Sequence, residues 1–139
     1  DKLYLKRGML LITDSGTVGR VVYVTSYHDG AIGTNNLIRV VISDEALRGY
    51  VYQFLLSSMG QDQLKANIYG GIIDHIEPDD VLRAFSDLAA VIEDCPRGCG
   101  HLGAPADPEC ALDTLRGPQA RRVAAARRLL TALNDAAAY

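Results

Sequence analysis

Three short runs of strand-forming residues lie close together at the start of this chain, and no helix-length segment separates them. They cover residues 9–12, 18–25 and 37–42, with glycines in and between them. Parallel strands need a crossover of about a dozen residues or more, usually a helix. The close spacing therefore predicts a small, curved antiparallel sheet.

A helical pattern replaces the strand pattern after Asp44, which is a suitable N-cap. Residues 57–60 are expected to break or bend this helix before residues 61–68 resume it. Pro78 opens a further helix, and an Ala/Arg/Leu-rich helix covers residues 118–138. The predicted fold class is thus α+β, with helices after the sheet. Apolar residues at three- and four-residue intervals are expected to face the core: Leu47, Val51, Phe54, Leu55, Met59, Val81, Leu82, Phe85, Leu88, Ile92, Val123, Leu129, Leu130 and Leu133.

The charge balance changes twice along the chain, although the net charge is only −3. Residues 1–73 have seven basic and six acidic side chains, residues 74–94 have seven acidic side chains and one arginine, and the chain from Arg116 onward is basic. We therefore expect two segments, residues 1–74 and residues 75–139. No apolar stretch approaches the roughly 18 residues of a membrane span, and no signal-peptide run opens the sequence. The expected location is cytoplasmic, without a membrane partner.

All three cysteines cluster with a histidine between residues 95 and 110. Three thiolates and one imidazole match the ligand set of a tetrahedral structural zinc site. The alternatives are a disulfide with a spare thiol, or unconnected buried cysteines. The odd number of cysteines argues against the first, and their clustering argues against the second. We expect a structural Zn²⁺ that stabilises a C-terminal helical segment, with a role in folding because four ligands leave no open position. The ligands are Cys95, Cys99, His101 and Cys110.

The segment from Thr13 to Arg20 follows a strand and is rich in glycine and hydroxyl groups. A Walker phosphate-binding loop has the pattern Gly-x-x-x-x-Gly-Lys-Ser/Thr, which the sequence lacks, and no helix clearly follows Gly19. The segment is therefore interpreted as a turn between two strands, with a ligand-facing role for its hydroxyls as the alternative. Because no catalytic constellation is found elsewhere in the sequence, we expect a chain that is not an enzyme by itself.

Residues 4 to about 80 resemble the target-recognition domain of the DNA-specificity subunit of type I restriction-modification systems. The resemblance is carried by residues 8–20, 33–39, 52–61 and 70–78, whose order and spacing are similar to the strand-turn-strand core and following helix of that family. It covers the later half of one such domain. The early half, and the long helices that dock the methyltransferase in that family, are not in this sequence.

The resemblance implies that side chains on strand ends and loops recognise DNA. Arginine is suited to guanine and phosphate, and asparagine to adenine. Each such residue taken alone is more often a turn or surface residue. The implied partners are double-stranded DNA and the methyltransferase or restriction subunits. The polar residues best placed for DNA contacts are Thr13, Ser15, Thr17, Arg20, Asn35, Asn36 and Arg39.

From about His75 to Leu133 the chain resembles another family, the C-terminal zinc-binding helical segment of the bacterial ribosome small-subunit-dependent GTPase. Residues 75–88, the Cys/His cluster and residues 108–112 carry this resemblance. The cysteines and histidine follow the ligand order of that family, although the gap from His101 to Cys110 is longer. The GTPase domain and RNA-binding barrel of the family are not in this sequence. The implied partner is small-ribosomal-subunit RNA.

Both resemblances include residues 74–81, where the charge balance also changes, so the chain is interpreted as a chimera of two unrelated sequences. The first hypothesis is a non-catalytic DNA-specificity fragment fused to a structural zinc segment. The second is a fragment of the ribosome-dependent GTPase, and the third is a zinc-stabilised domain that mediates only protein contacts. For the second hypothesis, the RNA contacts are Arg121, Arg122, Arg127 and Arg128, with a solvated helix face as the alternative interpretation.

Overall fold

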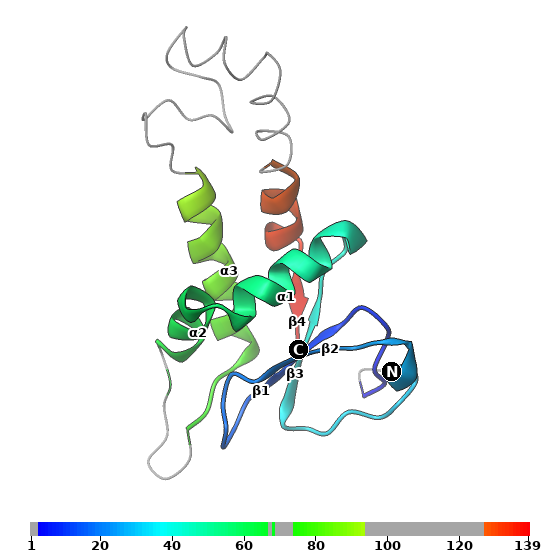
Figure 1. Ribbon diagram of the computed structural model, residues 1–139. Helices are drawn as coiled ribbons and strands as arrows, with labels where there is room; N and C mark the ends of the chain where they lie inside the picture. The colour runs from blue at the N-terminus through cyan, green and yellow to red at the C-terminus, as the bar shows by residue number, and fades with distance from the viewer. Residues whose placement is uncertain (1–2, 67, 69–73, 94–126) are drawn as a thin grey trace, which may run out of the picture. The chain divides into compact units, whose positions relative to one another are not determined.

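The structure is a computed structural model that describes residues 3–66, 68, 74–93 and 127–139. Its four strands form one antiparallel sheet in the order β2-β1-β3-β4 (Figure 1). With the helices that follow, this sheet confirms the predicted α+β class. The strands are β1 (Leu10–Thr13), β2 (Val21–Tyr23), β3 (Leu37–Val41) and β4 (Ala137–Ala138).

The helical elements follow β3, apart from one short turn of 3₁₀ helix between β2 and β3. Residues 127–134 are also helical. Among the described residues, no helix is long and apolar enough to cross a membrane. The elements are η1 (Ser26–His28), η2 (Glu45–Leu47), α1 (Arg48–Leu56), α2 (Ser58–Lys65) and α3 (Pro78–Glu93).

The chain divides into two compact units whose boundary lies within α3. The first unit comprises Asp1–Ala84 and Asp135–Tyr139, and the second comprises Phe85–Asn134. These bounds differ from the two segments expected from charge and resemblance. Whether residues 1–74 and 75–139 have separate origins therefore stays a prediction.

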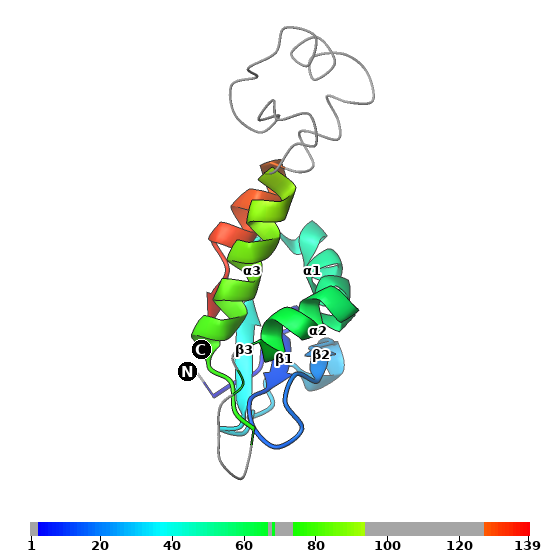
Figure 2. The same ribbon diagram turned by 90° about the vertical axis from the view of Figure 1, so that its left-hand side faces the viewer.

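Alternation along the strands gives the sheet two different faces. Successive side chains of a strand point to opposite sides, so Leu10, Ile12 and Val40 share one face. All three are fully buried. On that face Tyr23 of β2 meets Tyr52 of α1 edge-on, with ring centroids 5.9 Å apart. Figure 2 shows α1 and α2 on the same side of β3. Helix α1 thus covers the face of the sheet that holds the fully buried residues.

The opposite face carries a smaller apolar cluster. Leu11 of β1 packs there with residues from the segments that flank the strands, namely Leu5, Met9 and Val24. Arg39 lies directly opposite Leu11 in the β1–β3 register, so its side chain leaves the sheet on this same face. An arginine is thereby placed beside apolar neighbours.

Ser57 interrupts the long helical pattern, as predicted. It has an extended backbone (φ −67°, ψ 158°), and its hydroxyl accepts a hydrogen bond from the Gly60 amide at 3.1 Å, which caps α2. Val51, Phe54 and Leu55 of α1 are buried as expected. Met59 instead lies on the surface with 42% of its area exposed. The expectation for Met59 was wrong because the bend at Ser57 ends the helical register that placed it with α1.

Helix α3 begins at Pro78, as predicted. The Asp80 carboxylate accepts a hydrogen bond from the Glu77 amide at 2.8 Å and pairs with Arg83 at 3.0 Å. Val81 is buried in the first unit, and Phe85 and Leu88 are buried in the second. Leu82 is only half-buried, and the Ile92 side chain lies outside the described ones, so the expected apolar face of this helix is confirmed at Val81, Phe85 and Leu88.

The C-terminal residues form a strand where a helix was expected. Residues 127–134 are helical, with Leu129, Leu130 and Leu133 buried as predicted, whereas Val123 lies outside the described residues. Ala137 and Ala138 pair with β3, and Tyr139 exchanges two backbone hydrogen bonds with Arg39, at 2.7 and 3.0 Å. The predicted helix to residue 138 was wrong because backbone hydrogen bonding to the open edge of β3 outweighs the high helix propensity of the two alanines.

Candidate functional site

Six of the seven predicted DNA-contacting residues gather at one end of the sheet. Thr13 at the end of β1 pairs with Leu37 at the start of β3. The Thr13 amide donates to the Arg20 carbonyl at 3.0 Å, and the Asp14 amide donates to the Asn36 carbonyl at 3.3 Å. Figure 2 shows the β1–β2 connection and the start of β3 side by side. We call this the hairpin end; it comprises residues 13–20 and 34–37.

The β1–β2 connection is held by its own hydrogen bonds. The Thr13 hydroxyl donates to the Thr17 carbonyl and accepts from the Arg20 amide, and the Gly19 amide donates to the Thr13 carbonyl. The segment joins two strands, and no helix follows Gly19. This agrees with the interpretation as a turn, and it means that the Thr13 hydroxyl is already engaged within the loop.

A later segment of the chain braces the same loop. The Gly16 amide donates to the Asp74 carbonyl at 3.3 Å, and the Ile76 amide donates to the Asp14 carbonyl at 2.9 Å. Ser15 and His75 form an isolated antiparallel bridge between these bonds. The hairpin end is therefore tied to the residues that precede α3, which leaves Ser15 only partly exposed.

The other four predicted contact residues at the hairpin end are open to solvent. Thr17, Arg20, Asn35 and Asn36 are all exposed. Their side chains are thus accessible at the ends of β1, β2 and β3, where the sequence placed the DNA contacts.

Arg39 differs from the other predicted contacts because it is 5% exposed. Its two terminal nitrogens donate to the carbonyls of Leu37 and Thr34, each at 3.1 Å. The guanidinium also packs on Gly33, where an added Cβ would lie 2.7 Å from Nη2. In this position Arg39 holds the backbone that leads into β3 by hydrogen bonds to its carbonyls.

A hollow of about 440 Å³ runs along the outer strand β2 at the hairpin end. Thr17 and Arg20 line it from the loop, and Gln61 and Lys65 line it from α2. Gln61 Nε2 donates to the Gly19 carbonyl at 2.8 Å and to the Leu55 carbonyl at 2.7 Å, which fastens α2 to the loop. The hollow thus brings a loop cation and a helix cation together.

Lys65 is the residue that the sequence did not single out. It lies 45 positions after Arg20, and the fold of α2 over β2 is what brings it into the same hollow. Among the described residues, neither Arg20 nor Lys65 forms an ion pair. Two cations that form no ion pair within the described part of the chain therefore line a concave surface beside exposed amide and hydroxyl groups. A lone lysine near a helix C-terminus carries no signal that would have predicted this.

The four predicted zinc ligands, Cys95, Cys99, His101 and Cys110, lie outside the described residues. Within residues 3–66, 68, 74–93 and 127–139, no group of three His, Cys, Asp or Glu side chains is arranged to hold a metal ion. Of the predicted RNA contacts, Arg121 and Arg122 also lie outside the description, whereas Arg127 and Arg128 are exposed.

Comparisons of the chain with models of known protein families, with curated proteins and with solved structures gave no match. The sites must therefore be judged from the geometry of this chain.

Proposed function

We propose that this chain is a non-catalytic DNA-binding specificity fragment of a type I restriction-modification system, which contacts duplex DNA through the hairpin end. The observation that supports this most strongly is the hollow where Arg20 and Lys65 lie together without acidic partners among the described residues. Cations in such a position contact phosphates, and release of counterions from the phosphates drives binding.

Sequence discrimination would come from the loops beside the hollow. Phosphate contacts set the position of a protein on DNA, while contacts with base edges carry the sequence information. Asn35 and Asn36 are exposed at the start of β3, and an asparagine amide can form a bidentate pair with adenine. Arg20 and Lys65 are thus proposed as positioning contacts and the two asparagines as base contacts.

The salt dependence of DNA binding tests this proposal directly. Each phosphate neutralised by a lysine or arginine contributes about 0.9 to the slope of log K against log salt concentration. For Arg20→Gln/Lys65→Gln we expect the slope for duplex DNA to fall by about 2, measured by fluorescence anisotropy over a salt series. Arg7→Gln, which removes a cation from the opposite end of the sheet, is the matched control and should leave the slope unchanged.

Two results would overturn the proposal. Absence of salt-dependent affinity for duplex DNA in the parent chain would remove its basis. A fall of about 1 in the slope for Arg7→Gln, half of that expected for the double variant, would mean that binding follows net charge and not the hairpin end.

A second candidate function is contact with ribosomal RNA, supported by the exposed Arg127 and Arg128. Purified small ribosomal subunits provide the comparison. Cosedimentation of the chain with the subunits, lost in Arg127→Gln/Arg128→Gln and accompanied by no affinity for duplex DNA, would favour the ribosomal hypothesis over the DNA hypothesis.

We also propose that Cys95, Cys99, His101 and Cys110 bind one structural Zn²⁺, because three thiolates and one imidazole are the ligand set of such sites. Elemental analysis of the purified chain should give about one zinc ion per molecule, and Cys99→Ser should lower this content. Zinc absent from the parent, or unchanged in the variant, would end the proposal.

A further inference from the structure

A second hollow lies at the end of the sheet opposite the hairpin end. Its volume is about 300 Å³, and it is lined by Arg7, Gly8, Tyr23, Glu45 and Arg48. These residues come from the segment before β1, the end of β2 and the junction of η2 with α1. The volume is at the lower limit of small-molecule sites, which span roughly 300–1,000 Å³. We call this hollow the arginine pocket.

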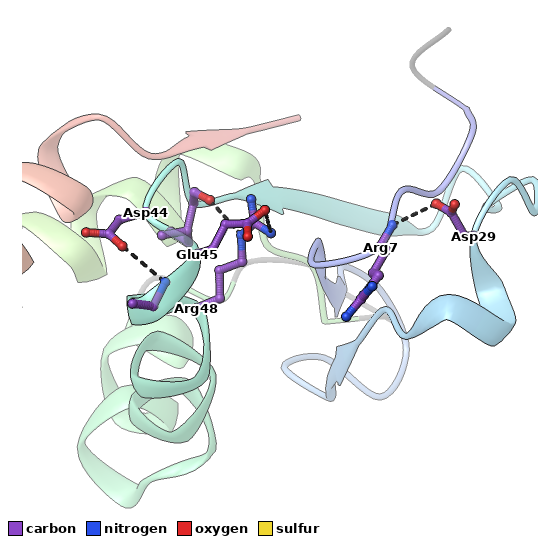
Figure 3. Close-up of polar contacts among 7 residues, drawn as sticks. Arg7, Asp29, Asp44, Glu45 and Arg48 are labelled. Carbon is purple, nitrogen blue, oxygen red and sulfur yellow. Dashed lines mark hydrogen bonds and ion pairs between the residues drawn. The ribbon is translucent and has the colours of Figure 1, made fainter.

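Arg48 is held in a fixed position in the arginine pocket. Its Nε donates to the Ile42 carbonyl at 2.9 Å, and Nη1 donates to the Glu45 carboxylate at 3.1 Å, as Figure 3 shows. The guanidinium lies so close over Gly8 that an added Cβ there would be 2.4 Å from Nη1. Only 19% of the Arg48 side chain is exposed. A guanidinium held in this way is ready to bind an anion with little further loss of side-chain entropy.

Arg7 supplies the second positive charge. The Asp29 carboxylate accepts from the Arg7 backbone amide at 2.8 Å, while the Arg7 side chain points away from Asp29 in Figure 3. Among the described residues, the Arg7 guanidinium forms no ion pair. Asp29 therefore positions the backbone of Arg7 and leaves its guanidinium for another group.

The charges of the arginine pocket are unbalanced. Two guanidinium groups line it with one carboxylate, that of Glu45. The Glu45 side chain is 83% exposed, and an ion pair with so exposed a partner is weak. An incoming anion can therefore replace Glu45 at Arg48 at little cost.

We propose that the arginine pocket binds a small ligand with a phosphate group, either inorganic phosphate or a phosphomonoester. A phosphate dianion balances two guanidinium charges and offers several acceptor oxygens for their paired N–H groups. Tyr23, which is half-buried at the pocket wall, adds a phenol that can donate to the same oxygens. The proposal does not depend on DNA binding, which was assigned to the opposite end of the sheet.

Calorimetric titration of the whole chain with inorganic phosphate and with adenosine monophosphate tests the proposal. Arg7→Gln should weaken phosphate binding by about tenfold or more, as expected for one charge-assisted contact. Its fold should be unaffected, because the Arg7 side chain forms no ion pair within the described residues. Glu45→Gln should strengthen binding, because it removes the competing carboxylate. Arg20→Gln, which removes a cation from the hairpin end, is the matched control and should bind phosphate as the parent does.

Amide NMR spectra show where the ligand binds and distinguish binding of a small phosphate anion from binding of a DNA backbone. Phosphate should shift the signals of Gly8 and Arg48 and leave those of Thr17 and Arg20 unchanged. Failure of the parent to bind either phosphate compound would overturn the proposal. Equal losses in Arg7→Gln and Arg20→Gln, or shifts at Gly8 that appear with duplex DNA but not with phosphate, would also overturn it.

Discussion

The two ends of the sheet use arginine in different ways. At the hairpin end, Arg20 lines a hollow of about 440 Å³ with Lys65, and neither has an ion-pair partner among the described residues. In the arginine pocket, Arg48 is fixed by a backbone carbonyl and by Glu45. The hairpin end is thus an open cationic surface, while the arginine pocket is a preorganised and partly neutralised one.

The two arginines differ in how much conformational entropy each loses when an anion binds. An exposed, unpaired cation contributes mainly long-range attraction, which depends on salt and suits a polyanion. A cation that is already fixed loses less conformational entropy and suits a ligand that matches its geometry. The position of an arginine, and not its presence, therefore decides which anion it can recognise.

The largest expected effect separates Arg39 from Arg20, which were both predicted as DNA contacts. Arg39→Ala removes a buried guanidinium and leaves the two carbonyls that it bonds without this donor. We therefore expect a loss of about 2–4 kcal/mol in the free energy of unfolding. Arg20→Ala, at an exposed site, should change it by about 0.5 kcal/mol or less. Urea unfolding measures both. A loss of DNA affinity in fully folded Arg39→Ala would return Arg39 to the DNA-binding surface.

Two glycines test how closely each end is packed. Gly8 in the arginine pocket has φ +87° and lies under Arg48, whereas Gly16 at the hairpin end has φ +71° and open space around it. Gly8→Ala should cost about 2–3 kcal/mol, from backbone strain and displacement of Arg48. Gly16→Ala should cost about 1 kcal/mol, from strain alone. Equal shifts in the urea midpoints would contradict the close packing of the arginine pocket.

The Asp44 side chain caps η2, the 3₁₀ turn that contains Glu45. The Asp44 carboxylate accepts from the Ala46 amide at 3.1 Å, so Asp44→Ala should destabilise the chain by about 1 kcal/mol. Asp44→Asn keeps an acceptor and should be nearly neutral. Thermal unfolding by circular dichroism measures the difference. If both variants unfold at the same temperature as the parent, the cap has no part in holding the pocket.

The smallest expected effect is that of Glu45→Gln on stability. Because the carboxylate is 83% exposed, its loss should change the free energy of unfolding by about 0.5 kcal/mol or less. The same variant is expected to bind phosphate more tightly, so stability and affinity should separate. A large destabilisation would mean that the Glu45–Arg48 ion pair is strong and that an anion does not readily replace Glu45.

Local sequence signals predicted most of the elements but not their partners. The strands at residues 10–13 and 37–41, the break at Ser57 and the start of α3 at Pro78 each depend on neighbouring residues. Arg39 was predicted as a DNA contact because the resemblance implies contacts from strand ends and loops, yet the register with Leu11 puts it on a covered face. No local pattern singled out Lys65, because its place in the candidate site depends on the β1–β2 loop, which is far away in the sequence.

Local sequence signals were sufficient to predict the antiparallel character of the sheet and the turn between residues 13 and 20. They were sufficient because strand alternation, turn residues and the absence of a crossover act over short distances along the chain. Three features could be seen only in the folded chain: the strand formed by Ala137 and Ala138, the position of Lys65 beside Arg20, and the pocket that Arg7 shares with Arg48. Each of these depends on contacts between residues distant in sequence, where backbone hydrogen bonding and packing outweigh local propensity.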